Sequence, residues 1–191
     1  MRASSLIVVT VAIACVATSC KRRDTQAAQH YGIGHAPTDS AIVEMNLDVS
    51  VEGAELPPGQ GTVAEGAVLY AMQCALCHGK NGEGVSPRLP ALIGRDPKGE
   101  QFRFANDPTL VRTIGNYWPY ATTLFDYIKR AMPLNAPGSL TDNETYALSA
   151  YLLAANAVIS DTTALDAISL RKVRMPYRDR FVPDDRKPTA H

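Results

Sequence analysis

The stretch Cys74-Ala75-Leu76-Cys77-His78 places two thiols three positions apart and an imidazole directly after the second thiol. Two thiols on one helical turn can form thioether bonds with the two vinyl groups at one edge of a porphyrin, and the adjacent imidazole then lies under the iron. Cys-x-x-Cys-His is the attachment signature of haem c. The spacing therefore predicts one covalently attached haem c, with His78 as its proximal iron ligand.

Three other kinds of site use cysteines at this spacing. A thioredoxin-like redox pair needs a strand before the motif and a helix after it, whereas here a predicted helix precedes the motif and Gly79 follows it. A zinc site needs a second pair of ligands, but the other cysteines are Cys15 and Cys20, near the N-terminus. A disulfide across two residues would be strained. The surrounding sequence thus favours haem over all three.

A stable electron carrier keeps its iron six-coordinate, and a methionine thioether opposite histidine raises the reduction potential. Met72 precedes the cysteines by two positions and would lie on the proximal side. Met132 stands in Ala-Met-Pro at the end of a predicted helix, where a loop can cross the distal face, so we predict Met132 as the sixth ligand. Met132 as a core gap filler is the alternative. Met175 is the second candidate ligand, and Met45 is the remaining one.

Further contacts with the haem are expected from three residues. A metal-bound histidine needs an acceptor for its other ring nitrogen, and the segment Pro90-Ala-Leu-Ile-Gly94 offers the carbonyl of Pro90. Leu92 is expected to pack on the haem. The N–H of Trp118, like the O–H of Tyr120, can donate to a haem propionate, although such amphipathic aromatics also occur at core edges without a ligand.

Capping boxes mark the start of two helices, at Thr62-x-x-Glu65 and at Thr141-x-x-Glu144. A third helix begins at Thr122 or Thr123 and ends before Pro133. Apolar spacing predicts the inward residues, which are Val63, Ala67, Val68 and Ala71 in the first helix and Leu124, Tyr127, Ile128 and Ala131 in the helix before Pro133. Gly66 permits the first helix to cross the last one closely.

The flanks of the helical region carry weaker signals. Between Val43 and Glu52 apolar and polar residues alternate, which predicts a half-buried strand. The strand and the C-terminal tail either bind a partner protein or wrap the surface of the domain itself. We divide the chain into a signal peptide (1–19), a tether with an extended strand (20–60), a haem domain (61–160) and an extended tail (161–191).

The N-terminus has the features of an export signal. Leu6 to Val16 is apolar apart from Thr10, which is too short to span a bilayer and suits a signal peptide. Ala17-Thr-Ser-Cys20 resembles a lipobox, in which Cys20 is lipidated; cleavage by ordinary signal peptidase after Ser19 is the alternative. We expect a periplasmic protein, membrane-anchored if Cys20 is lipidated.

Charge gives little indication of a partner. Lys and Arg together number 19, as do Asp and Glu, so the formal net charge is zero and no global basic field exists to hold nucleic acid. Lys129 and Arg130, next to Met132, are candidates for a local basic rim or for ordinary solvated charges.

Taken together, these motifs resemble those of class I cytochromes c. The segment from Asn116 to Pro133 is more specifically similar to the cytochrome subunit of bacterial sulfite dehydrogenases and to the cytochrome domain of sulfane dehydrogenase. The similarity extends over roughly residues 31–187, through Tyr31-Gly-Ile-Gly34, Ser139-Leu-Thr-Asp142, Ala150-Tyr-Leu-Leu153 and Arg174-Met-Pro176.

This resemblance implies a mainly α class I cytochrome c fold, with three or more helices around one haem. The N-terminal extended strand and the C-terminal tail, which the sequence pattern predicts, are additions to that fold. It places the axial methionine at Met132. It also implies a partner of the sulfite-oxidase type with a molybdopterin cofactor, which would pass electrons to this haem, and a downstream cytochrome or oxidase. A general membrane-tethered carrier, or a haem enzyme or gas sensor with an open iron position, is the alternative.

Overall fold

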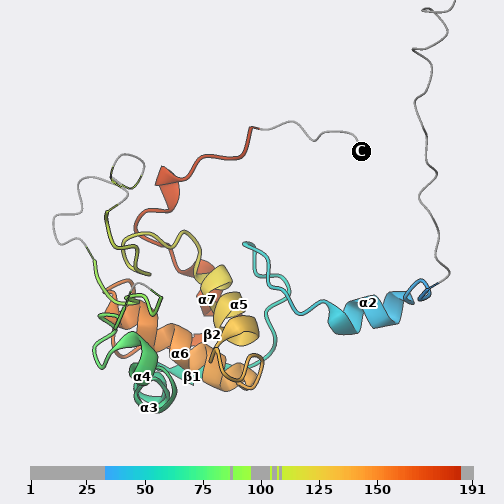
Figure 1. The fold of residues 1–191 in the computed structure, drawn as a ribbon, viewed down its shortest axis with the longest axis horizontal. Coiled ribbons are helices and arrows are strands. Elements are labelled where there is room, and N and C mark those ends of the chain that lie inside the picture. Colours follow the sequence, from blue (N-terminus) through green and yellow to red (C-terminus); the bar gives the residue numbers. More distant parts are fainter. Residues whose placement is uncertain (1–32, 87, 96–103, 105–106, 108, 186–191) are drawn as a thin grey trace, which may run out of the picture. The chain divides into compact units, whose positions relative to one another are not determined.

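The computed structural model describes residues 33–86, 88–95, 104, 107 and 109–185. The chain divides into two compact units, Met1–Val43 and Glu44–His191. The predicted signal peptide and Cys20 lie outside the described residues. Six α-helices and one two-stranded sheet make up the described part, so the prediction of a mainly α protein is confirmed (Figure 1).

The second unit is built on two helices that pack against each other, α3 (Val63–Gln73) and α6 (Asp142–Ala155) (Figure 1). Both helices begin at the predicted capping boxes, because the hydroxyls of Thr62 and Thr141 accept the backbone N–H three residues later. Gly66 lies at their closest approach. A Cβ on Gly66 would lie 1.9 Å from the carbonyl oxygen of Ala147, so only glycine allows this crossing.

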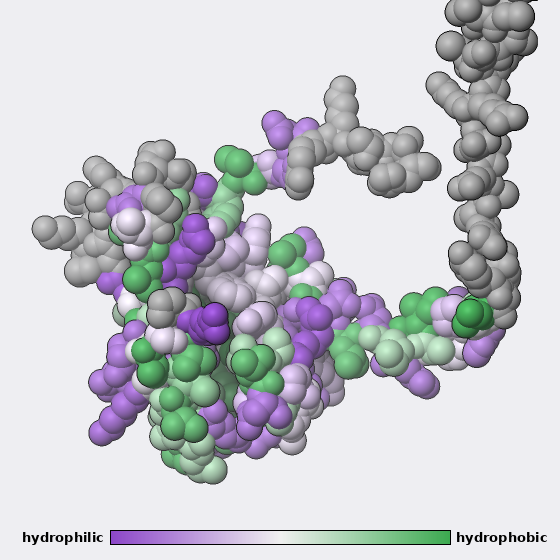
Figure 2. All heavy atoms as spheres, in the orientation of Figure 1, coloured by the Kyte–Doolittle hydropathy of each residue, from purple (hydrophilic) through white to green (hydrophobic). Residues whose placement is uncertain are grey.

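The buried face of α3 consists of Gly66 and Tyr70. The ring of Tyr70 lies 5.0 Å from that of Tyr151 on α6, and its hydroxyl donates to the carbonyl of Gly79 at 2.8 Å. The prediction that Val68 and Ala71 face the core is wrong, since both are exposed. Apolar residues of several types occur all round this helix, including Leu69 and Met72, so apolar spacing does not indicate its buried side. Some of them remain on its outer surface (Figure 2).

Helix α5 (Ala121–Ala131) packs on α6 through Phe125, which is fully buried and whose ring lies 4.6 Å from that of Tyr146. Leu124 and Ile128 are buried, as predicted. Tyr127 was expected to be buried but is exposed, with its ring 5.8 Å from that of Trp118.

The segment after α6 belongs to the core and is not simply an extended tail. Strand β2 (Ala164–Asp166) pairs antiparallel with β1 (Gln60–Thr62), and α7 (Ala167–Lys172) follows. Asp166 caps α7 by accepting from the backbone N–H groups of Ile168 and Ser169. Three side chains of the segment are buried in the hydrophobic core, those of Leu165, Leu170 and Met175. This part of the predicted tail therefore wraps its own domain.

The predicted strand from Val43 to Glu52 is wrong. Residues Asp39–Met45 form the short helix α2, which has no buried residue, and no strand follows it before β1. A strand needs a hydrogen-bonded neighbour, and the described strands β1 and β2 pair with each other instead. Only Val49 of the alternating apolar residues is buried. Its N–H donates to Asp126 on α5 at 2.8 Å.

The carboxylate of Asp126 also accepts from the side chain of Arg130. Burial raises the pKa of Asp126, but the hydrogen bonds from Arg130 and from the N–H of Val49 outweigh it and hold the pKa below its usual value. The segment around Val49 is thus tied to α5, whose C-terminal cap is Met132.

Among the described residues, no helix is both long and apolar enough to cross a membrane.

Candidate haem-binding site

The two cysteines lie on one tight helical turn, Cys74 at the junction of α3 and α4 (Ala75–His78) and Cys77 within α4. The N–H groups of Cys77 and His78 both donate to the carbonyl of Cys74, at 3.1 and 2.9 Å. Both thiols are free. The turn therefore presents two thiols and one imidazole in the order that thioether attachment to a porphyrin requires.

His78 has one ring nitrogen engaged. Its Nδ1 lies 2.8 Å from the carbonyl oxygen of Pro90, and because a carbonyl only accepts, Nδ1 carries the proton. Nε2 then keeps its lone pair and forms no hydrogen bond with any described residue. An imidazole held in this tautomer by a backbone carbonyl is the usual arrangement of a metal-bound histidine. The donor set therefore fits a haem iron at Nε2.

Two glycines bring Pro90 to His78. The N–H of Gly84 donates to the carbonyl of His78 at 2.7 Å, and the carbonyl of Gly82 accepts from the N–H groups of Leu92 and Ile93 at 2.8 and 3.0 Å. Gly82 and Gly84 have positive φ angles of 73° and 78°. A Cβ on Gly84 would lie 2.6 Å from the nitrogen of Ala91. Sequence reasoning missed both residues, although Gly-x-Gly a few residues before Pro90 is a signal for such a turn.

The other uses of a Cys-x-x-Cys pair fit less well. Burial, followed by the neighbouring Cys77, raises the pKa of the Cys74 thiol to about 11, whereas redox-active dithiols lower the pKa of the attacking thiol. No cluster of three or more His, Cys, Asp or Glu residues that could hold a metal ion occurs in the described part of the chain. The raised pKa of Cys74 therefore favours haem attachment over a redox-active dithiol.

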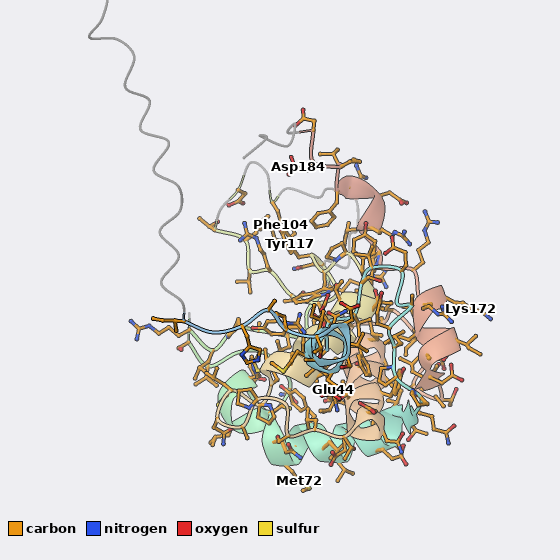
Figure 3. The ribbon with its side chains drawn as sticks, turned by 90° about the vertical axis from the view of Figure 1, so that its right-hand side faces the viewer. Glu44, Met72, Phe104, Tyr117, Lys172 and Asp184 are labelled. Carbon is orange, nitrogen blue, oxygen red and sulfur yellow. The ribbon has the colours of Figure 1, made fainter. Side chains whose placement is uncertain are left out.

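The four methionines proposed as sixth ligand differ in their surroundings. Met132 is half-buried at the end of α5, where its N–H donates to the carbonyl of Ile128 at 3.2 Å. Met72 is 72% exposed and projects outward from α3 (Figure 3), and Met45 is 82% exposed. Met175 is 2% exposed within the core. Met132 therefore stays the predicted ligand, while the surroundings of Met175 are those of a core residue.

Two comparisons with known proteins bear on this geometry. Residues 61–152 match the family described as cytochrome c oxidase, cbb3-type, subunit III. The fold matches the crystal structure of the sulfane dehydrogenase SoxCD from Paracoccus pantotrophus with a TM-score of 0.68 and 36% sequence identity, over 82% of this chain and 73% of that one. The chain belongs to the c-type cytochromes. It is an electron carrier related to the cytochromes of sulfur-oxidation dehydrogenases.

A second relative is named for the oxidation of a sulfur compound. The thiosulfate dehydrogenase of Stutzerimonas stutzeri (strain A1501) is 32% identical over 104 residues, which is 51% of this chain and 29% of the relative. The cytochrome thus spans less than a third of the length of that enzyme. Membership of the c-type cytochromes implies covalently bound haem c, in agreement with the geometry of Cys74, Cys77 and His78.

The loop of this cytochrome that follows Met132 is closed by Lys129. The ammonium group of Lys129 donates to the carbonyl of Leu140 at 2.6 Å and forms an ion pair with Asp142 at 2.8 Å. Arg130 is paired with Asp126. Lys129 and Arg130 were candidates for a basic rim, but both are engaged with their own domain, and the pairing of Lys129 joins the two ends of the Met132 loop.

Trp118 and Leu92 are half-buried at the edge of the cytochrome core. The indole N–H of Trp118 donates to the hydroxyl of Thr123 at 3.0 Å, so the donor predicted for a propionate is engaged within the chain. The guanidinium carbon of Arg178 lies over the ring of Tyr120, 4.9 Å from the centroid of that ring. Contact of Trp118 and Leu92 with haem remains a prediction, resting on their apolar surfaces.

Proposed function

We propose that this cytochrome is the electron-transfer subunit of a sulfur-oxidising dehydrogenase and carries a single haem c. The observation that supports the proposal best is the similarity to the sulfane dehydrogenase SoxCD over 82% of the chain at 36% identity. A single Cys-x-x-Cys-His motif in the sequence, at Cys74, supports one haem. The related thiosulfate dehydrogenase is a second sulfur-oxidising protein with a matching segment.

Bound haem c supplies a one-electron Fe(III)/Fe(II) couple. Cys74 and Cys77 would hold the group through two thioether bonds, each made by adding S–H across a vinyl double bond, an addition that exchanges no net electron. Nε2 of His78 and the sulfur of Met132 would hold its iron. With two protein ligands on the iron, no open position would remain for the substrate of a haem enzyme or for a sensed gas.

The partner in this proposal is a subunit of the sulfite-oxidase type with a molybdopterin cofactor, as the sequence resemblance implies. Oxidation of sulfite illustrates the balance, since sulfite and water give sulfate, two protons and two electrons. A single-haem protein accepts one electron at a time. The cytochrome must therefore be reduced twice per turnover and be reoxidised each time by another cytochrome or by a terminal oxidase.

We further propose that the protein acts in the periplasm, because haem c is attached outside the cytoplasm and residues 1–19 have the pattern of an export signal. Lipidation at Cys20 would tether it to the membrane. If Cys20 is lipidated, the wild-type protein should fractionate with membranes and Cys20→Ser should not. A wild-type protein found in the soluble fraction would indicate a freely diffusing form.

Purification of the native cytochrome from its own cells under mild conditions is expected to bring down a molybdenum protein. Metal analysis of the complex should give about one iron per molybdenum, and addition of sulfite or a sulfane compound should reduce the haem. A general carrier without a dedicated partner would purify free of molybdenum, and this result would contradict the proposal. Reduction of the isolated cytochrome by thiosulfate alone would contradict it as well, because the chain would then be a self-sufficient enzyme.

A further inference from the structure

Asn156 directly follows α6, and its side-chain amide binds the loop of residues 88–95 that carries Pro90, the proximal loop. It is 1% exposed. Its Oδ1 accepts from the N–H groups of Gly94 and Gly115 at 3.0 and 3.1 Å. Its Nδ2 donates to the carbonyls of Leu92 and Leu152 at 3.1 and 2.8 Å. All four hydrogen-bonding positions of the amide are therefore satisfied by backbone groups.

These bonds join three segments that are far apart in the sequence. Leu92 and Gly94 belong to the loop that carries Pro90, Gly115 precedes α5, and Leu152 lies in α6. The carbonyl of Leu92 also accepts from the N–H of Ile114 at 3.1 Å. The side-chain amide of Asn156 lies directly against Gly115, where an added Cβ would lie 2.5 Å from its Oδ1.

The proximal loop is thus held from two sides. Gly82 accepts from the N–H groups of Leu92 and Ile93 on one side, and Asn156 binds Leu92 and Gly94 on the other. Leu89, directly before Pro90, is held on its own side, because its carbonyl accepts from the N–H of Val85 and its N–H donates to the carbonyl of Ser86, both at 3.0 Å. On the C-terminal side of Pro90, the position of its carbonyl relative to His78 depends on how firmly Leu92 and Gly94 are held.

We propose that Asn156 is a positioning residue that sets the hydrogen bond between the carbonyl of Pro90 and Nδ1 of His78, and through it the reduction potential of the haem. A hydrogen bond from Nδ1–H to a carbonyl makes the imidazole more basic. A more basic ligand stabilises Fe(III) relative to Fe(II). Loosening the loop weakens the bond and raises the potential. This inference rests on axial ligation by His78, which belongs to the proposed function.

The test compares variants of exported holoprotein. Asn156→Leu removes all four hydrogen bonds and keeps the number and branching of the side-chain heavy atoms. Asn156→Asp keeps an oxygen to accept from Gly94 and Gly115 but lacks the amide donor to Leu92, and it carries the test if Asn156→Leu does not fold. Ser149→Ala is the matched control, because Ser149 is buried in α6 and donates only to the carbonyl of Thr145, at 2.7 Å.

We expect the equilibrium constant for haem reduction to rise at least about threefold in Asn156→Leu, about 28 mV at roughly 59 mV per tenfold, and to rise less in Asn156→Asp. The His78 Nδ1 proton, observed by NMR in the reduced protein, should exchange with solvent at least about tenfold faster. Ser149→Ala should lose stability but keep both values. If the Asn156 variants behave as Ser149→Ala does, the inference is wrong, whereas a wild-type protein without covalent haem would overturn the proposed function instead.

Discussion

Replacing Met132 by Ala is expected to abolish the weak far-red charge-transfer band of the oxidised protein and to lower its reduction potential. A thioether ligand favours Fe(II), so its loss shifts the potential downward by an amount on the order of 0.1 V, within the roughly 0.8 V range that axial ligands set. At about 59 mV per tenfold, that is about a fiftyfold change in the equilibrium constant for reduction. Optical redox titration measures both effects, and the reduced variant should also bind carbon monoxide.

Two other methionines provide the controls for this prediction. Met72→Ala removes an exposed side chain and should change neither the band nor the stability. Met175→Ala should keep the band but lower the free energy of unfolding by about 2–5 kcal/mol, because Met175 is buried in the core. Loss of the band in Met175→Ala and its retention in Met132→Ala would show that the C-terminal segment supplies the ligand.

Replacing Gly66 by Val is expected to prevent the packing of α3 on α6. The added Cβ would lie 1.9 Å from the carbonyl oxygen of Ala147 and 2.7 Å from the Cβ of Tyr151. A helix backbone cannot move aside locally, so the helices must separate. Overpacking of a core costs about 1–3 kcal/mol and occasionally more, and here we expect a loss of at least about 3 kcal/mol or no folded holoprotein. Urea unfolding followed by haem absorbance measures the loss.

Ala71→Val is the matched control for this substitution. Ala71 lies on the exposed side of the same helix, so a valine there costs only helix propensity, about 0.7 kcal/mol at most. Equal urea midpoints for Gly66→Val and Ala71→Val would mean that α3 and α6 do not cross as closely as the structure shows.

Local signals predicted the parts of the fold that local chemistry determines. The two capping boxes start α3 and α6 because their hydrogen bonds join residues three apart, which the sequence displays directly. The Cys-x-x-Cys-His motif likewise lies on one helical turn. In the same way, Pro133 ends α5, because proline cannot continue a helix.

The failures involve contacts between distant residues. The alternation around Val49 could not show that Asp126, on α5, would accept its N–H. The polar, proline-containing end of the chain, Pro183-Asp-Asp-Arg-Lys-Pro188, led to the prediction of a tail, although Leu165, Leu170 and Met175 each enter the core. Asn156 gave no signal at all, since a lone asparagine after a helix commonly serves only as its cap.

The mass of the exported protein tests the central claim most directly. The account predicts that protein produced in a strain with haem c maturation carries one added haem, which is retained in acid-acetone, and that the double variant Cys74→Ala, Cys77→Ala carries none. A wild-type mass without haem, or haem released by acid-acetone, would contradict the assignment of Cys74, Cys77 and His78 as the site of a covalent haem c.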